Sequence, residues 1–91
     1  MKINVAYHGQ LRAAAGAANE ELETHSGASV QDFLARLARS RPALKPFLLG
    51  PDDGPSRSLL LLVNDRQVRP GERRALKDGD SVALLPPIGG G

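Results

Sequence analysis

The chain has 91 residues, of which 41% are hydrophobic, enough for one small globular domain and no more. It contains no cysteine, which excludes disulfide bonds, thiolate catalysis and cysteine-ligated zinc. The net charge of +2 and the aromatic content of 3% supply neither the charge nor the stacking surfaces of a typical nucleic-acid-binding protein, so we expect no nucleic-acid partner.

The first residues alternate between polar and apolar, whereas a secretory signal has an unbroken apolar run. The longest apolar run, residues 59–63, is far shorter than the roughly 20 residues that cross a bilayer. We therefore expect a cytoplasmic protein with no membrane partner. The histidines His8 and His25 cannot form a metal site alone, and we expect no bound metal.

The N-terminal segment predicts a pair of strands. Every second residue from Ile3 is apolar within residues 2–8, which is the pattern of a half-buried strand. Residues 9–16 contain two glycines and are predicted to be a connection. Residues 19–24 form a weaker strand candidate, so this region is interpreted as a hairpin closed by a turn or bulged loop.

The strongest helical pattern begins after Ser29, a favourable N-cap, with Asp32 at the third helical position. The apolar residues that share one face of this helix are Val30, Phe33, Leu34, Leu37 and Ala38. Pro42 ends the helix. The basic residues Arg36, Arg39, Arg41 and Lys45 are interpreted as a solvated face rather than a nucleic-acid site.

The second half of the chain predicts three further strands. Residues 43–49 are expected to form a short helical turn broken at Pro46, and residues 50–55 an exposed loop. The predicted strands and turns that follow are a buried strand at 58–64, a turn at 65–66, a return strand at 67–69, turns at 70–71 and 77–80, and a last strand at 81–85.

Strands combined with one crossing helix predict an α+β fold, with a mixed sheet of four to five strands and one main helix packed on one face. We expect residues 1–91 to form a single domain, in which residues 86–91 are an extended, flexible C-terminal tail. Pro86 and Pro87 end the last strand because proline cannot donate to a sheet ladder.

The C-terminal tail is the segment of the sequence that suggests a chemical function. Glycine has no Cβ, so a chain ending in Gly89, Gly90 and Gly91 can thread a narrow channel in another protein. A carboxylate at its tip becomes reactive only once ATP has converted an oxygen into a leaving group. The alternative is a terminal glycine segment with no chemical role.

Three segments resemble the MoaD/ThiS family of ubiquitin-like sulfur carriers. Leu11-Arg12 with Gly16 resembles the segment after the family's first strand, and Val63-Asn64 followed by Asp78-Gly79-Asp80 resembles its late hairpin and entry to the last strand. The ending, residues 85–91, matches a pattern of two prolines, an apolar residue, a variable residue and diglycine. The resemblance covers essentially the whole chain and implies the β-grasp fold.

The resemblance also implies a function. Gly90-Gly91 is the functional diglycine, and an E1-like adenylating enzyme uses ATP to activate the Gly91 carboxylate. A sulfurtransferase then supplies sulfur, so that Gly91 becomes a thiocarboxylate that donates it. In the molybdopterin branch the acceptor complex contains the large subunit of molybdopterin synthase. The carrier binds no cofactor and is not catalytic alone; it acts as a sulfur-donating subunit or co-substrate.

The residues around the tail suggest a docking surface. A β-grasp sheet has one face without helices, and strand parity places His8 near that face. The candidate partner-binding residues are Leu85, Pro86, Pro87, Ile88, Gly89 and His8. The alternatives are that Leu85 only covers the sheet and that His8 is a solvated surface residue.

Four functions follow from these observations. The first is the small subunit of molybdopterin synthase. The second is the same chemistry in cysteine, thiamine or tRNA-thiolation pathways, which the length of residues 50–57 also fits. The third is a ubiquitin-like modifier conjugated through Gly91. The fourth is a β-grasp interaction module whose tail has no chemistry.

Overall fold

The computed structural model describes residues 1–52, 54–69 and 72–86. The predicted turn at 70–71 and the predicted tail after Pro86 therefore lie outside the described residues. The elements in chain order are β1 (Lys2–Tyr7), α1 (Gln10–Ala15), β2 (Asn19–Glu23), α2 (Val30–Ser40), the 3₁₀ helix η1 (Pro42–Leu44), α3 (Lys45–Leu48), β3 (Leu60–Val63), β4 (Arg66–Val68) and β5 (Ser81–Leu85).

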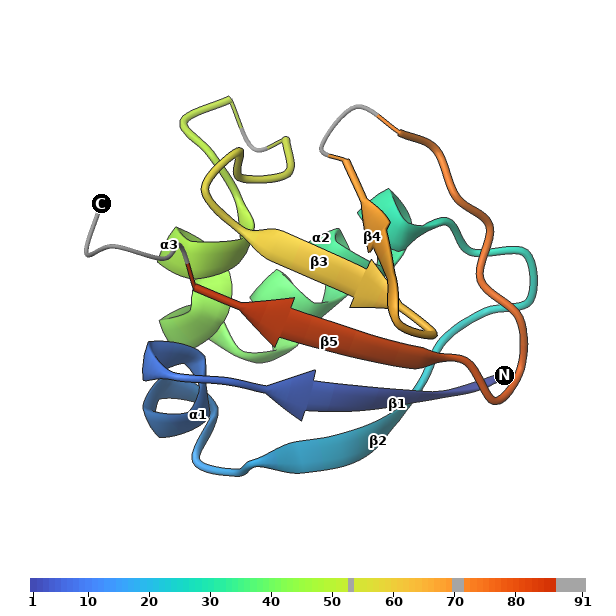
Figure 1. Cartoon of the computed structure of the whole chain (residues 1–91), viewed down its shortest axis with the longest axis horizontal. Helices are drawn as coiled ribbons and strands as arrows, with labels where there is room; N and C mark the ends of the chain where they lie inside the picture. The colour runs from blue at the N-terminus through green and yellow to red at the C-terminus, as the bar shows by residue number, and fades with distance from the viewer. Residues whose placement is uncertain (53, 70–71, 87–91) are drawn as a thin grey trace.

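The five strands form one mixed sheet in the order β2-β1-β5-β3-β4. The central strand β5 runs parallel to β1 and antiparallel to β3, whereas β2 and β4 pair antiparallel at the two edges. The helices cover one face of this sheet (Figure 1). The sequence prediction of an α+β, β-grasp arrangement is confirmed, and the first and last strands lie adjacent and parallel within the sheet.

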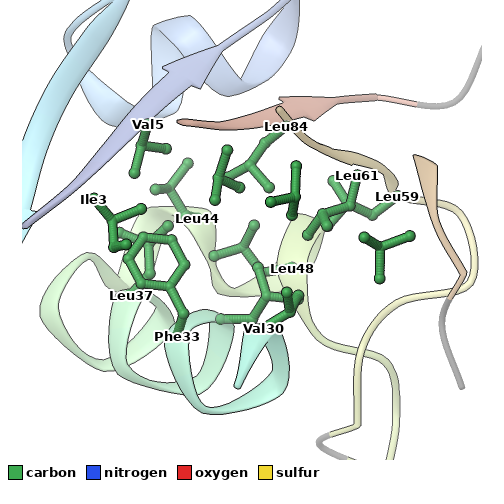
Figure 2. Packing of buried hydrophobic residues seen from close by; sticks show 14 of the residues in the cluster. Ile3, Val5, Val30, Phe33, Leu37, Leu44, Leu48, Leu59, Leu61 and Leu84 are labelled. Atoms are coloured by element: carbon green, nitrogen blue, oxygen red, sulfur yellow. The ribbon is translucent and has the colours of Figure 1, made fainter. Parts of the chain in front are cut away.

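The core lies between the sheet and the helices. Strand alternation sends Ile3, Val5 and Leu84 toward the apolar side chains of α2 and α3, including Phe33 and Leu48 (Figure 2). All five residues predicted for the buried face of α2 are at most 3% exposed. The orientation of β5 is therefore set by burial, with Val82 and Leu84 inward and the alternate residues outward.

A capping box starts α2. The Ser29 hydroxyl accepts a hydrogen bond of 3.1 Å from the Asp32 N–H, and the Asp32 carboxylate accepts one of 3.1 Å from the Ser29 N–H. The backbone hydrogen bond from Ser29 and its side-chain hydrogen bond lower the pKa of Asp32. This local agreement of cap and apolar spacing explains why the helix was predictable.

The predicted connection over residues 9–16 is wrong, because residues 10–15 form the helix α1. The helix is too short to show an apolar repeat, and Leu11 is its buried residue, with none of its surface exposed. Gly16 ends it in the left-handed conformation, at φ 76°, and its N–H donates to the carbonyl of Arg12. The two strands of the N-terminal hairpin are thus joined through a helix.

Two further predictions need correction. Pro46 does not break the turn at 43–49, because it lies in the first turn of α3, where a missing N–H costs no helical hydrogen bond. The turn between β3 and β4 is Asn64-Asp65 rather than residues 65–66, and both residues have positive φ, 50° and 69°. A two-residue hairpin turn needs that conformation, which asparagine and aspartate tolerate better than arginine.

Candidate functional site

The sheet face opposite the helices carries an apolar strip. Leu60 on β3 pairs with Leu85 on β5, and Leu62 pairs with Ala83, so these side chains share the face that is not covered by α2. Ala6 on β1 pairs with Ala83 and extends the strip. All five residues are half-buried rather than enclosed. We call this surface the open face.

A groove of about 430 Å³ runs across the open face. Its lining residues come from four strands, the residue that follows β1 and the β3–β4 turn. They include Asn4, Ala6, His8, Asn19, Glu21, Leu62, Asp65, Ser81 and Ala83. An apolar middle with a polar rim is the usual composition of a surface that binds another protein. The open face therefore fits a macromolecular partner.

His8 lines this groove and is half-buried, in agreement with its prediction from strand parity. Leu85 and Pro86 are also half-buried at the end of β5. The structure thus brings His8 and Leu85 to the open face, beside the place where the chain leaves the sheet. Pro87, Ile88, Gly89, Gly90 and Gly91 lie outside the described residues.

Hydrogen bonds of Asn64 and Asp80, which belong to the segments that resemble the MoaD/ThiS family, fix the start of β5. The Asn64 side chain donates to the Asp80 carboxylate at 2.9 Å and accepts from the Ser81 N–H at 3.0 Å. The other Asp80 carboxylate oxygen accepts from the Lys77 N–H at 2.8 Å. Burial opposes ionisation of Asp80, but the hydrogen bonds from Asn64 and Lys77 outweigh it and lower its pKa.

These contacts give the late hairpin and the Asp-Gly-Asp turn a structural role. The Asp80 carbonyl accepts from the Asn4 N–H of β1 at 2.9 Å, and the N–H of Asn64, the residue after β3, donates to the Ser81 carbonyl at 2.8 Å. The turn therefore joins the strands on both sides of β5 at one end of the sheet. The start of β5 is therefore fixed between β1 and β3.

A polar cluster that the sequence did not reveal links β1, β2 and the end of α2. The Tyr7 hydroxyl donates to Glu20 at 2.5 Å, and Arg41 donates to both oxygens of that carboxylate, with 2.6 Å for the bond from Nε. Burial, and then the hydrogen bond to Glu20, raise the pKa of Tyr7. Arg41 is therefore part of this cluster and not of the solvated basic face predicted for α2.

The cluster predicts a pH dependence of stability. The hydrogen bond from Arg41 holds the pKa of Glu20 below its ordinary value of 4.5. The pair therefore stabilises the fold fully above pH 4.5, and this contribution is lost as the pH falls through the lowered pKa. Arg41→Met is expected to remove about 1 kcal/mol of stability at neutral pH and less in acid.

Chemical denaturation of both chains from neutral pH to below the ordinary pKa of Glu20 measures this effect. Arg39→Met, in the exposed part of α2, is the matched control. An equal loss of stability at every pH in the Arg41→Met chain would contradict the role assigned to the ion pair.

Two kinds of site were not found among the residues that the structure describes. They contain no cluster of three or more acidic, histidine or cysteine side chains suited to a metal ion. Within the same ranges, no helix has the length and hydropathy needed to span a membrane.

Comparison with known proteins decides the family. The family model described as the ThiS family matches residues 5–91, which include both the open face and the glycine ending. The chain belongs to the ThiS family. The molybdopterin synthase sulfur carrier subunit of Chlamydomonas reinhardtii is 36% identical to it over 91 residues, all of both chains.

Several solved structures share the fold. SAMP1 from Haloferax volcanii superposes with a TM-score of 0.86 at 28% identity, covering all of both chains. The structure of the BexX/CysO complex from Amycolatopsis orientalis contains a chain that matches with a TM-score of 0.72 at 25% identity, over 98% of this chain and 99% of that one. The β-grasp fold of this chain is therefore shared with solved structures that bear different names.

Proposed function

We propose that this chain is a sulfur carrier whose Gly91 carboxylate is adenylated by an E1-like enzyme and converted to a thiocarboxylate. The carboxylate attacks the α-phosphorus of ATP and releases pyrophosphate. A persulfide on a sulfurtransferase then attacks the acyl carbon, and AMP leaves. A thiol cleaves the S–S bond of the resulting acyl disulfide, which leaves the thiocarboxylate on Gly91 and a disulfide on the donor side.

The observation that carries this proposal is the match to the ThiS family through the glycine ending, together with the relationship to a sulfur carrier subunit along the whole chain. The absence of cysteine in the sequence fits the chemistry, because the sulfur is held by a carboxyl terminus and needs no thiol in the carrier. ATP belongs to the adenylating enzyme, and no cofactor is bound by the carrier.

The open face supplies the docking surface in this proposal. Its apolar strip includes Leu62, Ala83 and Leu85, and His8 lies in the adjoining groove. We infer that Pro86 to Gly89 complete the contact as the tail enters the partner. If the partner binds the sheet, the glycine ending is free to enter a narrow catalytic channel, because glycine has no side chain that would obstruct entry.

The pathway favoured by the comparisons is molybdenum cofactor biosynthesis, with this chain as the small subunit of molybdopterin synthase. The 36% identity to the Chlamydomonas protein along all of both chains supports it. The relationship to CysO supports sulfur transfer to another pathway as the second candidate. The likeness to SAMP1, the small archaeal modifier protein 1 of Haloferax volcanii, supports a modifier role as the third.

Deletion of Gly91 tests the proposed function. The full chain is expected to support ATP-dependent pyrophosphate exchange by the adenylating enzyme, whereas the deleted chain is expected to support none, because its new carboxylate falls short of the α-phosphate. Arg39→Met, an exposed substitution on α2, is the control for handling and folding. Equal exchange by the full and deleted chains would contradict the proposal.

The pathway needs a separate experiment. The full chain, used as bait in its own cell extract, is expected to recover the large subunit of molybdopterin synthase. Recovery of a cysteine synthase instead would assign the chain to the second candidate. Isopeptide-linked products that contain the Gly91 terminus would support the modifier role.

A further inference from the structure

The turn between β1 and α1 has a backbone conformation that favours glycine. Gly9 has φ 57° and ψ −131°, a region that side-chain-bearing residues rarely adopt. Its carbonyl accepts a hydrogen bond of 3.1 Å from the Arg12 N–H, and the carbonyl of His8 accepts one of 3.1 Å from the Leu11 N–H. Gly9 thus reverses the chain from the sheet directly into the first turn of α1.

Pro86 lies directly against this turn. A Cβ atom placed on Gly9 would be 2.8 Å from Pro86 Cγ and 3.3 Å from Pro86 Cδ, the first of which is shorter than real Cβ contacts. The His8 N–H donates to the carbonyl of Leu84 at 3.1 Å, which continues the pairing of β1 with β5 toward this contact. The space left by the missing side chain of Gly9 is therefore occupied by the proline ring.

Both sides of this contact are held in place. Leu11, two residues after Gly9, is fully buried and anchors α1 in the core. The ring of Pro86 fixes its own φ, and a following proline in the sequence disfavours a helical conformation at Pro86. The end of β5 and α1 lie at the same end of the sheet (Figure 1). The position of Pro86 is thus tied to the α1 turn.

We propose that Gly9 is a positioning residue for sulfur transfer, because it seats Pro86 and so aims the C-terminal tail relative to the open face. This inference rests on the proposed carrier function. A partner that binds the open face must also bind the Gly91 carboxylate, five residues after Pro86, in its active site. A fixed departure at Pro86 reduces the orientations that this segment samples before it reaches the active site.

Another glycine supplies the matched control. Gly16 also has a positive φ, 76°, but a Cβ placed on it meets nothing within 4 Å. Gly16→Ala therefore places an alanine at a positive φ beside α1 without disturbing Pro86, although Gly16 is in the left-handed helical region, with ψ 15°, and Gly9 has ψ −131°. Gly16→Ala thus controls for an alanine at a positive φ, and the Pro86→Ala background controls for the backbone strain at Gly9 itself.

The experiment measures kcat and KM of pyrophosphate exchange with the adenylating enzyme for the full chain, Gly9→Ala and Gly16→Ala. Gly9→Ala is expected to lower kcat about tenfold, because the carboxylate is misplaced. KM is expected to stay within about twofold, because the open face is unchanged. Gly16→Ala is expected to leave both constants near those of the full chain.

Pro86→Ala provides the second background of a double-mutant cycle, because it removes the Cγ and Cδ atoms that the new Cβ would meet. In that background Gly9→Ala is expected to change kcat by less than about twofold, which is the coupling that contact between the two residues predicts. The same decrease in kcat in both backgrounds, or no decrease in the first, would overturn the positioning role. So would equal losses in the Gly9→Ala and Gly16→Ala chains.

A measurement on the unaltered chain keeps the inference testable if Gly9→Ala fails to fold. Nuclear Overhauser effects between the Gly9 Hα protons and the Pro86 ring protons are expected in solution, and their absence would overturn the seat. Failure of the full chain to support any exchange would instead contradict the proposed function, independently of that contact.

Discussion

An Ala83→Arg chain is expected to fold normally and to bind its partner about thirtyfold more weakly or worse, a loss of about 2 kcal/mol or more. Ala83 lies on the central strand β5 and lines the groove of the open face. An arginine there places a charge in the middle of the apolar strip, where docking would bury it without a partner. Solvent reaches this position in the unbound chain, because Ala83 is only half-buried.

Ala35→Arg is the matched control, since Ala35 is also half-buried but lies on α2, on the opposite side of the molecule. Isothermal titration calorimetry with the adenylating enzyme or the sulfur acceptor compares the two variants. Equal affinities for the Ala83→Arg chain and the unaltered chain would show that docking does not use the open face.

Leu84→Ala is expected to have the largest effect on stability, a loss of about 2–5 kcal/mol in the free energy of unfolding. Leu84 is fully buried on the central strand, and its removal leaves a cavity between the sheet and the helices (Figure 2). For a domain of this size the midpoint of thermal unfolding is expected to fall by roughly 10 °C or more.

The neighbouring Leu85→Ala is the control, because Leu85 points to the open face. Its cost to stability is expected to be about 1 kcal/mol or less, while partner binding weakens. Thermal unfolding followed by circular dichroism distinguishes the two. Similar losses of stability in both variants would contradict the assignment of the two faces of β5.

The predictable parts of the fold are the elements whose sequence signal lies within the element itself. In α2 the Ser29 cap and the apolar spacing after it identify the same helix. In β1 the alternation of apolar residues gives the buried face directly, whereas β5 has apolar residues on both faces and its buried face is known only from the structure. His8 could be placed near the open face because it continues the alternation of β1.

The parts that escaped prediction depend on contacts between distant residues or on very short elements. Helix α1 buries Leu11 alone, so it has no repeat to detect. The pairing of Arg41 with Glu20 joins residues 21 positions apart and needs the fold before it can be seen. The contact of Gly9 with Pro86 likewise exists only once β1 and β5 lie side by side.

The central claim is that sulfur is carried on the Gly91 carboxylate. The most direct measurement is intact and fragment-ion mass spectrometry of the full chain after incubation with ATP, the adenylating enzyme and a sulfur donor. The expected result is an increase in mass equal to the exchange of one oxygen for sulfur, found only in fragments that contain Gly91. An unchanged mass while the enzyme is active, or sulfur on fragments that lack Gly91, would contradict the claim.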